Sequence, residues 1–173
     1  MRQQERLVDF KKIHAQHKEF LEATLWKLTG DRDRFADALQ DALLAMWKHL
    51  DKLRSDGTRS YLYRIALTAA GKTWRQRPQG TDDLADDLPA ITDNPTGPVE
   101  ESETLDQLRW AITQLPDRQA RAVAMRYLES KEYSQVAGDM NCSEAAVRSH
   151  VSKGLEALRR KLGKLFAEEH RHE

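Results

Sequence analysis

The sequence has little cysteine, glycine or proline, and it contains no long apolar run. A single cysteine, Cys142, excludes an internal disulfide and a zinc site built from several cysteines. No stretch is apolar enough to span a membrane, and the charged N-terminus has no signal-peptide core, so we expect a cytoplasmic protein. Glycine-rich phosphate loops, metal-ligand clusters and nucleophile–base pairs are missing as well. We therefore expect no enzyme activity, no cofactor and no metal.

The residues that are abundant favour helix. Ala, Leu, Arg, Lys, Glu and Gln dominate, and apolar residues recur at helical spacing between clear turn signals such as Asp56-Gly57. The expected helices cover residues 5–28, 33–50, 60–77, 103–114, 116–128, 133–140 and 144–166, with a polar loop at Lys52–Thr58. The first of them could also be two shorter helices. These patterns predict an all-α protein made of two small helical domains.

The balanced net charge conceals a strong segregation of charge along the chain. Residues 1–77 carry 16 Lys/Arg and 10 Asp/Glu, whereas residues 78–108 carry 9 Asp/Glu and no Lys or Arg. Residues 109–173 carry 12 Lys/Arg and 9 Asp/Glu. Four of the five prolines fall within residues 78–102. We therefore predict two basic domains, 1–77 and 103–173, joined by an acidic flexible linker, 78–102.

Residues 133–153 have the pattern of a helix-turn-helix. Val136, Ala137 and Met140 form the inward side of a short helix, Asn141–Ser143 is a turn, and Ser143 is a good N-cap for the next helix. The second helix is expected to turn Ala146, Val147 and Val151 inward and to expose Arg148, Ser149, His150, Ser152 and Lys153. Such side chains suit phosphates and base edges in a major groove. A purely structural pair of helices is the alternative, because any two short helices can have this spacing.

The wider sequence resembles a known family. Residues 115–162 resemble region 4 of bacterial sigma factors, through Leu115-Pro116-Asp117-Arg118-Gln119, Val136-Ala137 and Val147-Arg148-Ser149. Residues 14–77 resemble region 2 of the same family, through Gly30-Asp31, Gln40-Asp41, Trp47 and Tyr61-Leu62-Tyr63-Arg64-Ile65-Ala66. With only these two regions and a linker, the chain resembles an RNA polymerase sigma factor of the extracytoplasmic-function type.

The resemblance implies a function and a set of site residues. Residues 1–77 would bind core RNA polymerase and the −10 promoter element, and residues 103–173 would bind the −35 element, so that transcription can initiate. The implied −35 residues are Ser143, Glu144, Ala145, Arg148, Ser149, His150, Ser152 and Lys153. The implied −10 residues are Lys52, Arg54, Ser55, Asp56, Thr58, Tyr61, Arg64, Thr68, Lys72 and Arg75. The implied polymerase-binding residues are Asp37, Gln40, Asp41 and Leu44.

The sequence departs from the family pattern in its second predicted helix. Arg34-Phe35-Ala36-Asp37 stands where the family has an acidic stretch on its polymerase-contacting face, so only Asp37 keeps the charge. We hypothesise weak binding to core polymerase until a phosphorylated Thr or Ser restores negative charge. In addition, Lys72 replaces the usual Asp of the third helix and is expected to add positive charge to the DNA face. Trp74 could contact nucleic acid or belong to the core.

Two alternatives to a working sigma factor remain. The chain could be a stand-alone helix-turn-helix regulator, with residues 1–77 used for dimerisation or sensing. It could also be a sigma-like protein whose polymerase binding is weakened or depends on phosphorylation. An anti-sigma factor or a regulatory kinase would then join core polymerase and promoter DNA as expected partners. A stand-alone regulator binds duplex operator without polymerase, whereas a sigma factor supports run-off transcription by core polymerase.

Overall fold

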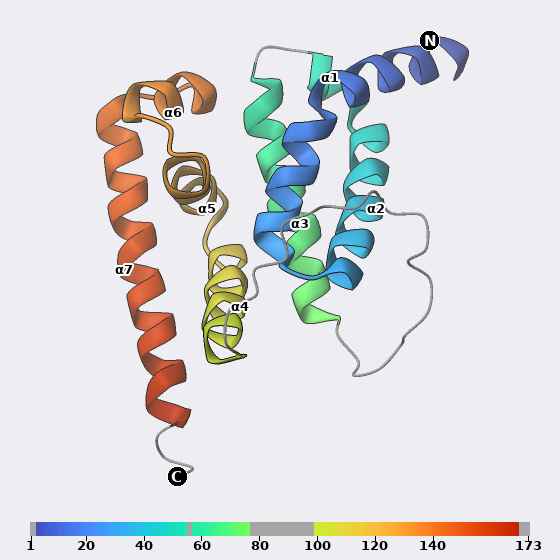
Figure 1. Ribbon diagram of the computed structural model, residues 1–173. Helices are drawn as coiled ribbons and strands as arrows, with labels where there is room; N and C mark the ends of the chain where they lie inside the picture. Colours follow the sequence, from blue (N-terminus) through green and yellow to red (C-terminus); the bar gives the residue numbers. More distant parts are fainter. Residues whose placement is uncertain (1–2, 55–56, 77–98, 170–173) are drawn as a thin grey trace.

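The computed structural model describes residues 3–54, 57–76 and 99–169, and every element in these ranges is helical (Figure 1). In chain order the elements are α1 (Gln3–Thr29), α2 (Arg32–Lys48), η1 (Leu50–Arg54), α3 (Thr58–Arg75), α4 (Val99–Thr113), α5 (Asp117–Val123), η2 (Ala124–Leu128), α6 (Tyr133–Met140) and α7 (Glu144–Glu169). The predicted all-α class is confirmed. None of the helices in these ranges is both long and apolar enough to cross a bilayer.

The N-terminal half, residues 3–76, packs α1, α2 and α3 around one apolar core. Gly30 ends α1 with a positive φ of 74°, which a residue without Cβ adopts at little cost. Asp31 then caps α2 by accepting a hydrogen bond from the Arg34 backbone N–H at 2.9 Å. This turn reverses the chain, so that Leu25 and Phe35 are both buried in the core that they share with Leu62 of α3.

The expected polar loop at Lys52–Thr58 is wrong in its first three residues, which belong to a short helix, and in its last, because α3 begins at Thr58. The second helix ends at Lys48 rather than at Leu50, and Leu50–Arg54 form the short 3₁₀ helix η1. The physical reason is apolar spacing, because Leu50 and Leu53 are both buried and a 3₁₀ turn places residues three apart on one side. The Thr58 hydroxyl donates a hydrogen bond to the Leu53 carbonyl at 2.9 Å. Ser55 and Asp56 lie outside the described residues.

The C-terminal half, residues 99–169, contains α4 to α7. Its first helix begins at Val99, four residues before the expected start at Glu103. Glu103, the expected first residue, therefore lies one turn inside α4. The helix expected at 116–128 is divided into α5 and the π-helical turn η2. The remainder of the expected linker, residues 78–98, lies outside the described residues.

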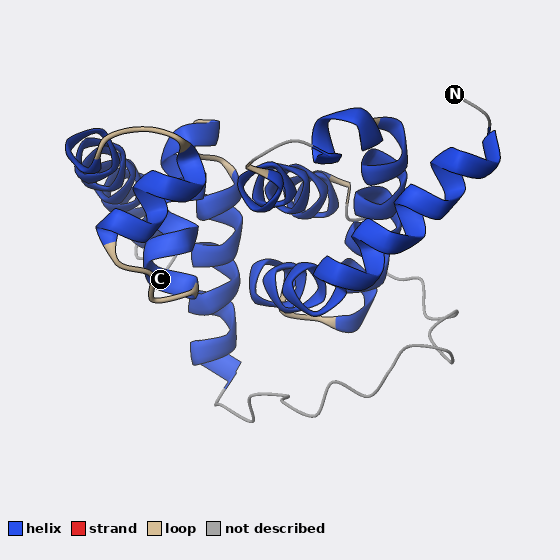
Figure 2. Ribbon diagram, turned by 90° about the horizontal axis from the view of Figure 1, so that it is seen from above, coloured by secondary structure: helices blue, strands red, loops and turns tan. Residues whose placement is uncertain are grey.

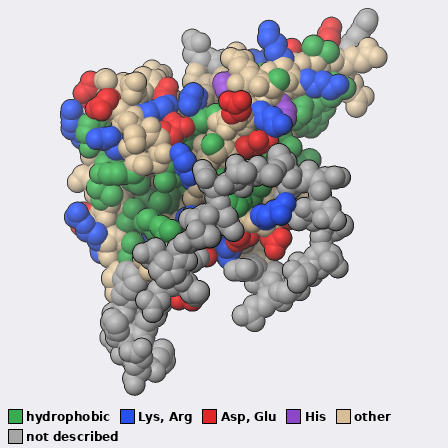
Figure 3. Space-filling model, in the orientation of Figure 1, with side chains coloured by type: hydrophobic (Ala, Val, Ile, Leu, Met, Phe, Trp, Pro, Cys, Tyr) green, Lys and Arg blue, Asp and Glu red, His purple; other side chains and the backbone are tan. Residues whose placement is uncertain are grey.

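The two halves pack side by side, with α4, α5 and α6 against α1 and α3 (Figures 1 and 2). Their apolar side chains form a continuous core, in which Leu25 and Ala66 of the N-terminal half join Ile112 and Leu115 of the C-terminal half. Apolar side chains also remain visible along the line where α7 runs beside α4 (Figure 3). Nothing in the periodicity of single helices indicates this contact between halves.

One glycine of α7 marks a close approach to α5. A Cβ at position 154 would lie 2.7 Å from Val123 Cγ2, a distance that real Cβ contacts avoid. Val123 is itself buried and branched at Cβ, so its side chain has little room to move. Gly163, further along the same helix, has nothing within 4 Å of the corresponding position. Gly154 is therefore required by packing, whereas Gly163 is not.

We expect opposite effects when these two glycines are replaced by alanine. Gly163→Ala should stabilise the protein by roughly 0.5–1 kcal/mol, because alanine is the better helix former. Gly154→Ala should destabilise it by about 1–2 kcal/mol, because the overpacking cost exceeds the gain in helix propensity. Thermal unfolding should show Tm shifts of a few degrees in opposite directions. Equal stabilisation by both substitutions would contradict the close contact of α7 with α5.

Candidate nucleic-acid interface

The helix-turn-helix predicted at residues 133–153 is formed by α6 and α7. Asn141 adopts a left-handed conformation (φ 52°) that ends α6, and the Cys142 N–H donates to the Ala137 carbonyl at 3.1 Å. The Ser143 hydroxyl then accepts a hydrogen bond from the Ala146 N–H at 3.1 Å. The prediction that Ser143 caps the second helix is thus confirmed. Val136, Ala137, Val147 and Val151 are buried as expected, and Met140 is half-buried.

The exposed face of α7 carries the residues that the sequence assigns to the −35 element. Arg148, Ser149, Ser152 and Lys153 are exposed, and so are Ser143, Glu144 and Ala145 at the start of the helix. The Arg148 guanidinium lies 4.8 Å from the centre of the Tyr133 ring and forms an ion pair of 3.3 Å with Glu144. Two neighbours therefore orient Arg148 while its side chain remains 57% exposed. Because Glu144 is paired with Arg148, its carboxylate lowers the net positive charge of this face.

His150 is the least exposed of the expected −35 residues. Burial, together with the positive charges of Arg118, Lys153 and Arg121, lowers the pKa of its imidazole below the usual 6.5. The ring is therefore neutral at neutral pH. Arg118 and Arg121 of α5 thus lie near His150 of α7, although Arg121 is paired with Asp117 at 2.7 Å and its side chain is only 15% exposed. Sequence reasoning did not select these two residues, because they belong to another helix.

A groove of about 500 Å³ runs between α2 and α3. Its lining residues are Asp41, Leu44, Ala45, Lys48, His49, Lys52, Tyr61, Arg64, Ile65, Thr68, Ala69 and Lys72. Five residues expected at the −10 element therefore meet in one place, together with two of those expected to bind polymerase. Lys48 and His49 of this groove were not selected from the sequence. A signal was present in the sequence, because Lys48 lies four residues after Leu44 and four before Lys52, both of which were selected.

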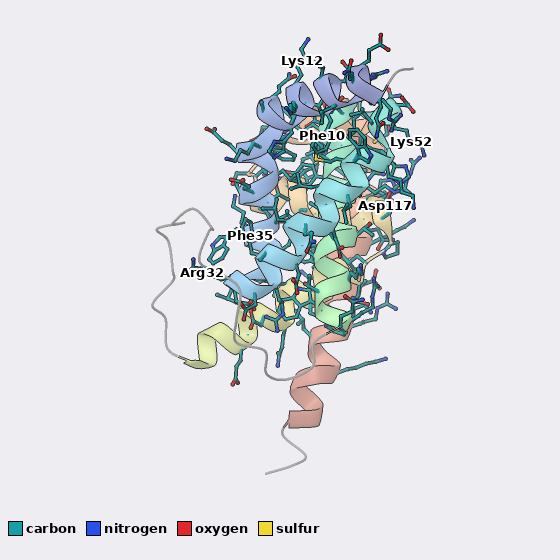
Figure 4. All side chains as sticks on the ribbon, turned by 90° about the vertical axis from the view of Figure 1, so that its right-hand side faces the viewer. Phe10, Lys12, Arg32, Phe35, Lys52 and Asp117 are labelled. Carbon is teal, nitrogen blue, oxygen red and sulfur yellow. The ribbon has the colours of Figure 1, made fainter. Side chains whose placement is uncertain are left out.

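The aromatic ring of Tyr61 forms part of the lining of this groove. The ammonium group of Lys52 lies 5.8 Å from the centre of the Tyr61 ring, and the His49 ring approaches it edge-on at 6.2 Å. An aromatic ring beside a cation is suited to a single-stranded base and its phosphate. In Figure 4, Lys52 and Asp117 lie along the same edge of the molecule. Asp117 is 3.9 Å from Arg64, which remains 58% exposed.

Not every expected −10 residue contributes to the groove. The Arg54 guanidinium forms an ion pair with Asp9 of α1, and Thr58 is held by the Leu53 carbonyl. Arg75 is exposed at the end of α3 and is not among the lining residues. Lys72 lines the groove and is 47% exposed, and its ammonium group lies 3.0 Å from the Asp41 carboxylate. Asp41 offsets the positive charge that Lys72 brings to α3.

The outer face of α2 carries the other residues expected to bind polymerase. Asp37 and Gln40 are exposed, and Leu44, one turn further on, is 61% exposed. Arg34, by contrast, points inward and is only 7% exposed. Its guanidinium stacks 3.7 Å from the centre of the Trp74 ring. Arg34 is therefore not displayed on the face where the family has acidic side chains, and the expectation that placed it there is wrong.

Trp74 packs within the N-terminal half and contributes to its structure rather than facing nucleic acid. Its indole N–H donates to the Leu28 carbonyl at 3.1 Å, and its ring supports the Arg34 guanidinium. The side chain is half-buried at the junction of α1, α2 and α3. The neighbouring Arg75 and Arg77 suggested a nucleic-acid contact from the sequence alone. The position of the indole along α3 instead turns it toward the end of α1.

Two family models match this chain, one in each half. The model described as "Sigma-70 region 2" matches residues 13–78, and the model described as "Sigma-70, region 4" matches residues 105–158. Among solved structures, CnrH in complex with the cytosolic domain of CnrY is 16% identical, with a TM-score of 0.48, and covers 90% of this chain and 88% of that one. The sigma factor RpoE in complex with the anti-sigma factor NepR from Bartonella quintana is 22% identical, with a TM-score of 0.46, and covers 90% and 97%.

Curated relatives carry the same family name over nearly the whole chain. The ECF RNA polymerase sigma-E factor of Escherichia coli is 28% identical over 168 residues, which cover 89% of this chain and 85% of the relative. The RNA polymerase sigma-H factor of Pseudomonas aeruginosa is 26% identical over 175 residues, covering 94% and 90%. Both family models match in the expected order and together cover more than half of the residues. The chain belongs to the sigma-70 family and is an RNA polymerase sigma factor of the ECF type.

Proposed function

We propose that the two halves divide promoter recognition between them. The N-terminal half would bind core RNA polymerase through the outer face of α2 and hold the melted −10 strand in the groove between α2 and α3. The C-terminal half would bind the −35 duplex with α7. The groove carries this proposal, because it gathers an aromatic ring and several cations beside the exposed Asp37, Gln40 and Leu44 of α2. Opened DNA and polymerase would thus meet on one helix pair.

The chemistry of the groove is suited to an opened strand rather than to a duplex. A base that leaves the duplex loses its stacking energy, and stacking on a ring such as Tyr61 recovers about 1–3 kcal/mol. Lys48, Lys52 and Arg64 would meanwhile neutralise phosphates of the same strand. The ion pair of Lys72 with Asp41 would keep the inner wall of the groove fixed in position. Binding of the opened strand would in this way favour melting.

The partners follow from this role. The polymerase would perform the chemistry of RNA synthesis, so we propose that the chain itself is not an enzyme and acts in the cytoplasm, where the polymerase works. Two similar solved structures were determined with a second protein bound, CnrY in one and the anti-sigma factor NepR in the other. By analogy we propose an anti-sigma factor as a further partner. Core polymerase and promoter DNA are the required ones.

Transcription with purified core polymerase on a promoter library tests the proposal directly. Specific transcripts above the core-only background are the expected result. Their absence would reject a sigma factor that initiates transcription and would favour a sigma-like protein. Binding of duplex DNA as a dimer, without any need for polymerase, would favour the stand-alone regulator instead.

Arg148→Ala should weaken binding of the −35 duplex by roughly tenfold or more, because a guanidinium that reads a base contributes about 1–3 kcal/mol. Lys164→Ala is a matched control, since Lys164 is exposed on the same helix but lies about 24 Å further along its axis. Fluorescence anisotropy with a −35 duplex at fixed salt measures both affinities. An equal loss in the two variants would show that α7 provides only general electrostatic attraction.

Tyr61→Ala should slow promoter opening by at least fivefold, because the opened base loses its stacking surface. Tyr61→Phe should retain most of the activity, since its ring can still stack. Permanganate reactivity of −10 thymines measures opening, and a template with a pre-melted −10 segment serves as the control. Pre-melting should restore transcription by Tyr61→Ala. A defect that persists on the pre-melted template would assign Tyr61 to another step.

His150 gives the −35 interaction an expected dependence on pH. In the protein without DNA, the pKa of the His150 imidazole lies below 6.5. Affinity for the −35 duplex should therefore not change between pH 8 and pH 7. As the pH falls below 6.5, protonation adds one positive charge near the DNA, and affinity for the −35 duplex should rise. His150→Gln should abolish this rise. If the variant showed the same rise, the titrating group would lie elsewhere.

A further inference from the structure

The start of α1, residues 3–12, lies across the end of the N-terminal half where α2 stops and η1 follows (Figures 1 and 4). The family model of region 2 begins at residue 13, so this segment precedes the match. Arg6, Asp9 and Phe10 are spaced three and four residues apart and therefore lie on one side of the helix. All three contact α2 or η1, and we call them the α1 brace.

Arg6 holds the end of α2 and the start of η1 together. Its guanidinium donates to the Trp47 carbonyl at 3.1 Å and lies 3.5 Å from the Asp51 carboxylate of η1. The last four carbonyls of an α-helix have no partner within that helix, so Arg6 supplies a donor to one of them. The same guanidinium lies 5.4 Å from the centre of the Trp47 ring. The Arg6 side chain is only 26% exposed, because these contacts cover most of it.

Asp9 and Phe10 extend the contact that Arg6 begins. Asp9 forms an ion pair with Arg54, the last residue of η1. Phe10 is half-buried and packs edge-on against the Trp47 ring, with the ring centres 5.6 Å apart. The α1 brace therefore rests on α2 through Trp47 and holds η1 near both of its ends, through Asp51 and Arg54.

The turn that is held in this way carries one end of the groove. Lys52 lies between the two held positions of η1, and its ammonium group is 5.8 Å from the centre of the Tyr61 ring. His49, whose ring approaches Tyr61 at 6.2 Å, immediately precedes η1. Buried Leu50 and Leu53 fix only the inner side of this turn. Because a 3₁₀ turn has poorer hydrogen-bond geometry than an α-helix, contacts from outside matter more for its conformation.

We infer that the α1 brace positions η1 for capture of the opened −10 strand. Arg6 and Asp9 are thus positioning residues for promoter opening, which act through Lys52 and Tyr61 rather than by touching DNA. A turn that is already held in its binding conformation loses less conformational freedom when the strand binds, so less binding free energy is spent on ordering it. The inference rests on the proposed use of the groove, but the hold on η1 can be measured without DNA or polymerase.

Arg6→Gln and Asp9→Asn remove the two charges of the α1 brace and keep side chains of comparable size. Lys12→Gln and Glu19→Gln remove the same charges from exposed positions on the same helix and are the matched controls; Lys12 points outward from α1 (Figure 4). Asp9→Glu keeps the charge and should behave as the unaltered protein does. Because partly exposed ion pairs contribute little stability, the Tm of every variant should stay within a few degrees of that of the unaltered protein.

Amide hydrogen exchange in the free protein measures whether the α1 brace holds η1. Arg6→Gln and Asp9→Asn should each speed exchange within residues 50–54 by roughly two- to fivefold, while the buried part of α3 stays protected. Both control variants should exchange as the unaltered protein does. Unchanged exchange within residues 50–54 in both brace variants would overturn the inference.

Promoter opening by the holoenzyme measures whether the groove depends on the α1 brace. Arg6→Gln should slow opening of a duplex promoter by roughly two- to fivefold and leave the affinities for core polymerase and for the −35 duplex unchanged. A pre-melted −10 segment should restore its transcription. In a Tyr61→Ala background the same substitution should have little further effect, because both act on one step. A merely structural defect would lower all of these activities and would add to the effect of Tyr61→Ala.

The outcomes separate this inference from the proposed function. If Arg6→Gln speeds exchange in η1 but opens promoters normally, while Tyr61→Ala opens them slowly, the inference is overturned and the role of the groove stands. Normal opening by Tyr61→Ala as well would reject the proposed use of the groove itself. An equal slowing by Lys12→Gln would also overturn the inference, because the loss of any positive charge from α1 would then explain the result.

Discussion

The burial of α3 on more than one side is the constraint on which the rest of this structure depends. A helix that packs against a single neighbour buries one stripe, but α3 buries residues around much of its circumference, from Ser60 through Tyr63 to Thr73. Ala66, Ala69 and Ala70 allow α2 and α1 to approach closely, while Tyr63 enters the other half. What remains exposed on α3 is a narrow strip with Arg64, Thr68 and Lys72, and this strip becomes one wall of the groove.

The cations of this protein fall into two groups. Some are paired with carboxylates within the fold, and others lie on open surfaces. Lys72 and Arg54 face carboxylates of the same half, and Arg34 and Arg59 interact with carboxylates of the other half. The cations that lie on open surfaces, such as Arg64 and Arg148, are held by partners at their edges and keep more than half of their surface. Because exposed ion pairs contribute little stability, these partners can exchange for phosphates at low cost.

Arg34 shows how a departure from a family pattern can be misread. In the sequence it stands within a stretch expected on the polymerase-contacting face, where a positive charge would weaken binding. In the structure its guanidinium is stacked on Trp74 and paired with Asp31 and Asp106, so its charge is neutralised inside the molecule. Asp37 remains exposed on the outer face of α2. The substitution therefore alters the contact between the two halves more than the surface offered to a partner.

The sequence by itself determined the all-α class, the approximate helix boundaries and the helix-turn-helix, because these depend on periodicity and on local capping residues such as Ser143. It also identified the groove residues Tyr61 and Lys52 through the family pattern, although their roles stay predictions. Only the tertiary structure decided that Trp74 and Arg34 face inward, that Lys72 is paired with Asp41, and that Tyr63 joins the other half. The reason is physical, because a helix pattern shows which residues share a face but not which partner covers that face. The contact between residues more than forty positions apart, such as Arg121 with Ser60, leaves no local trace in the sequence.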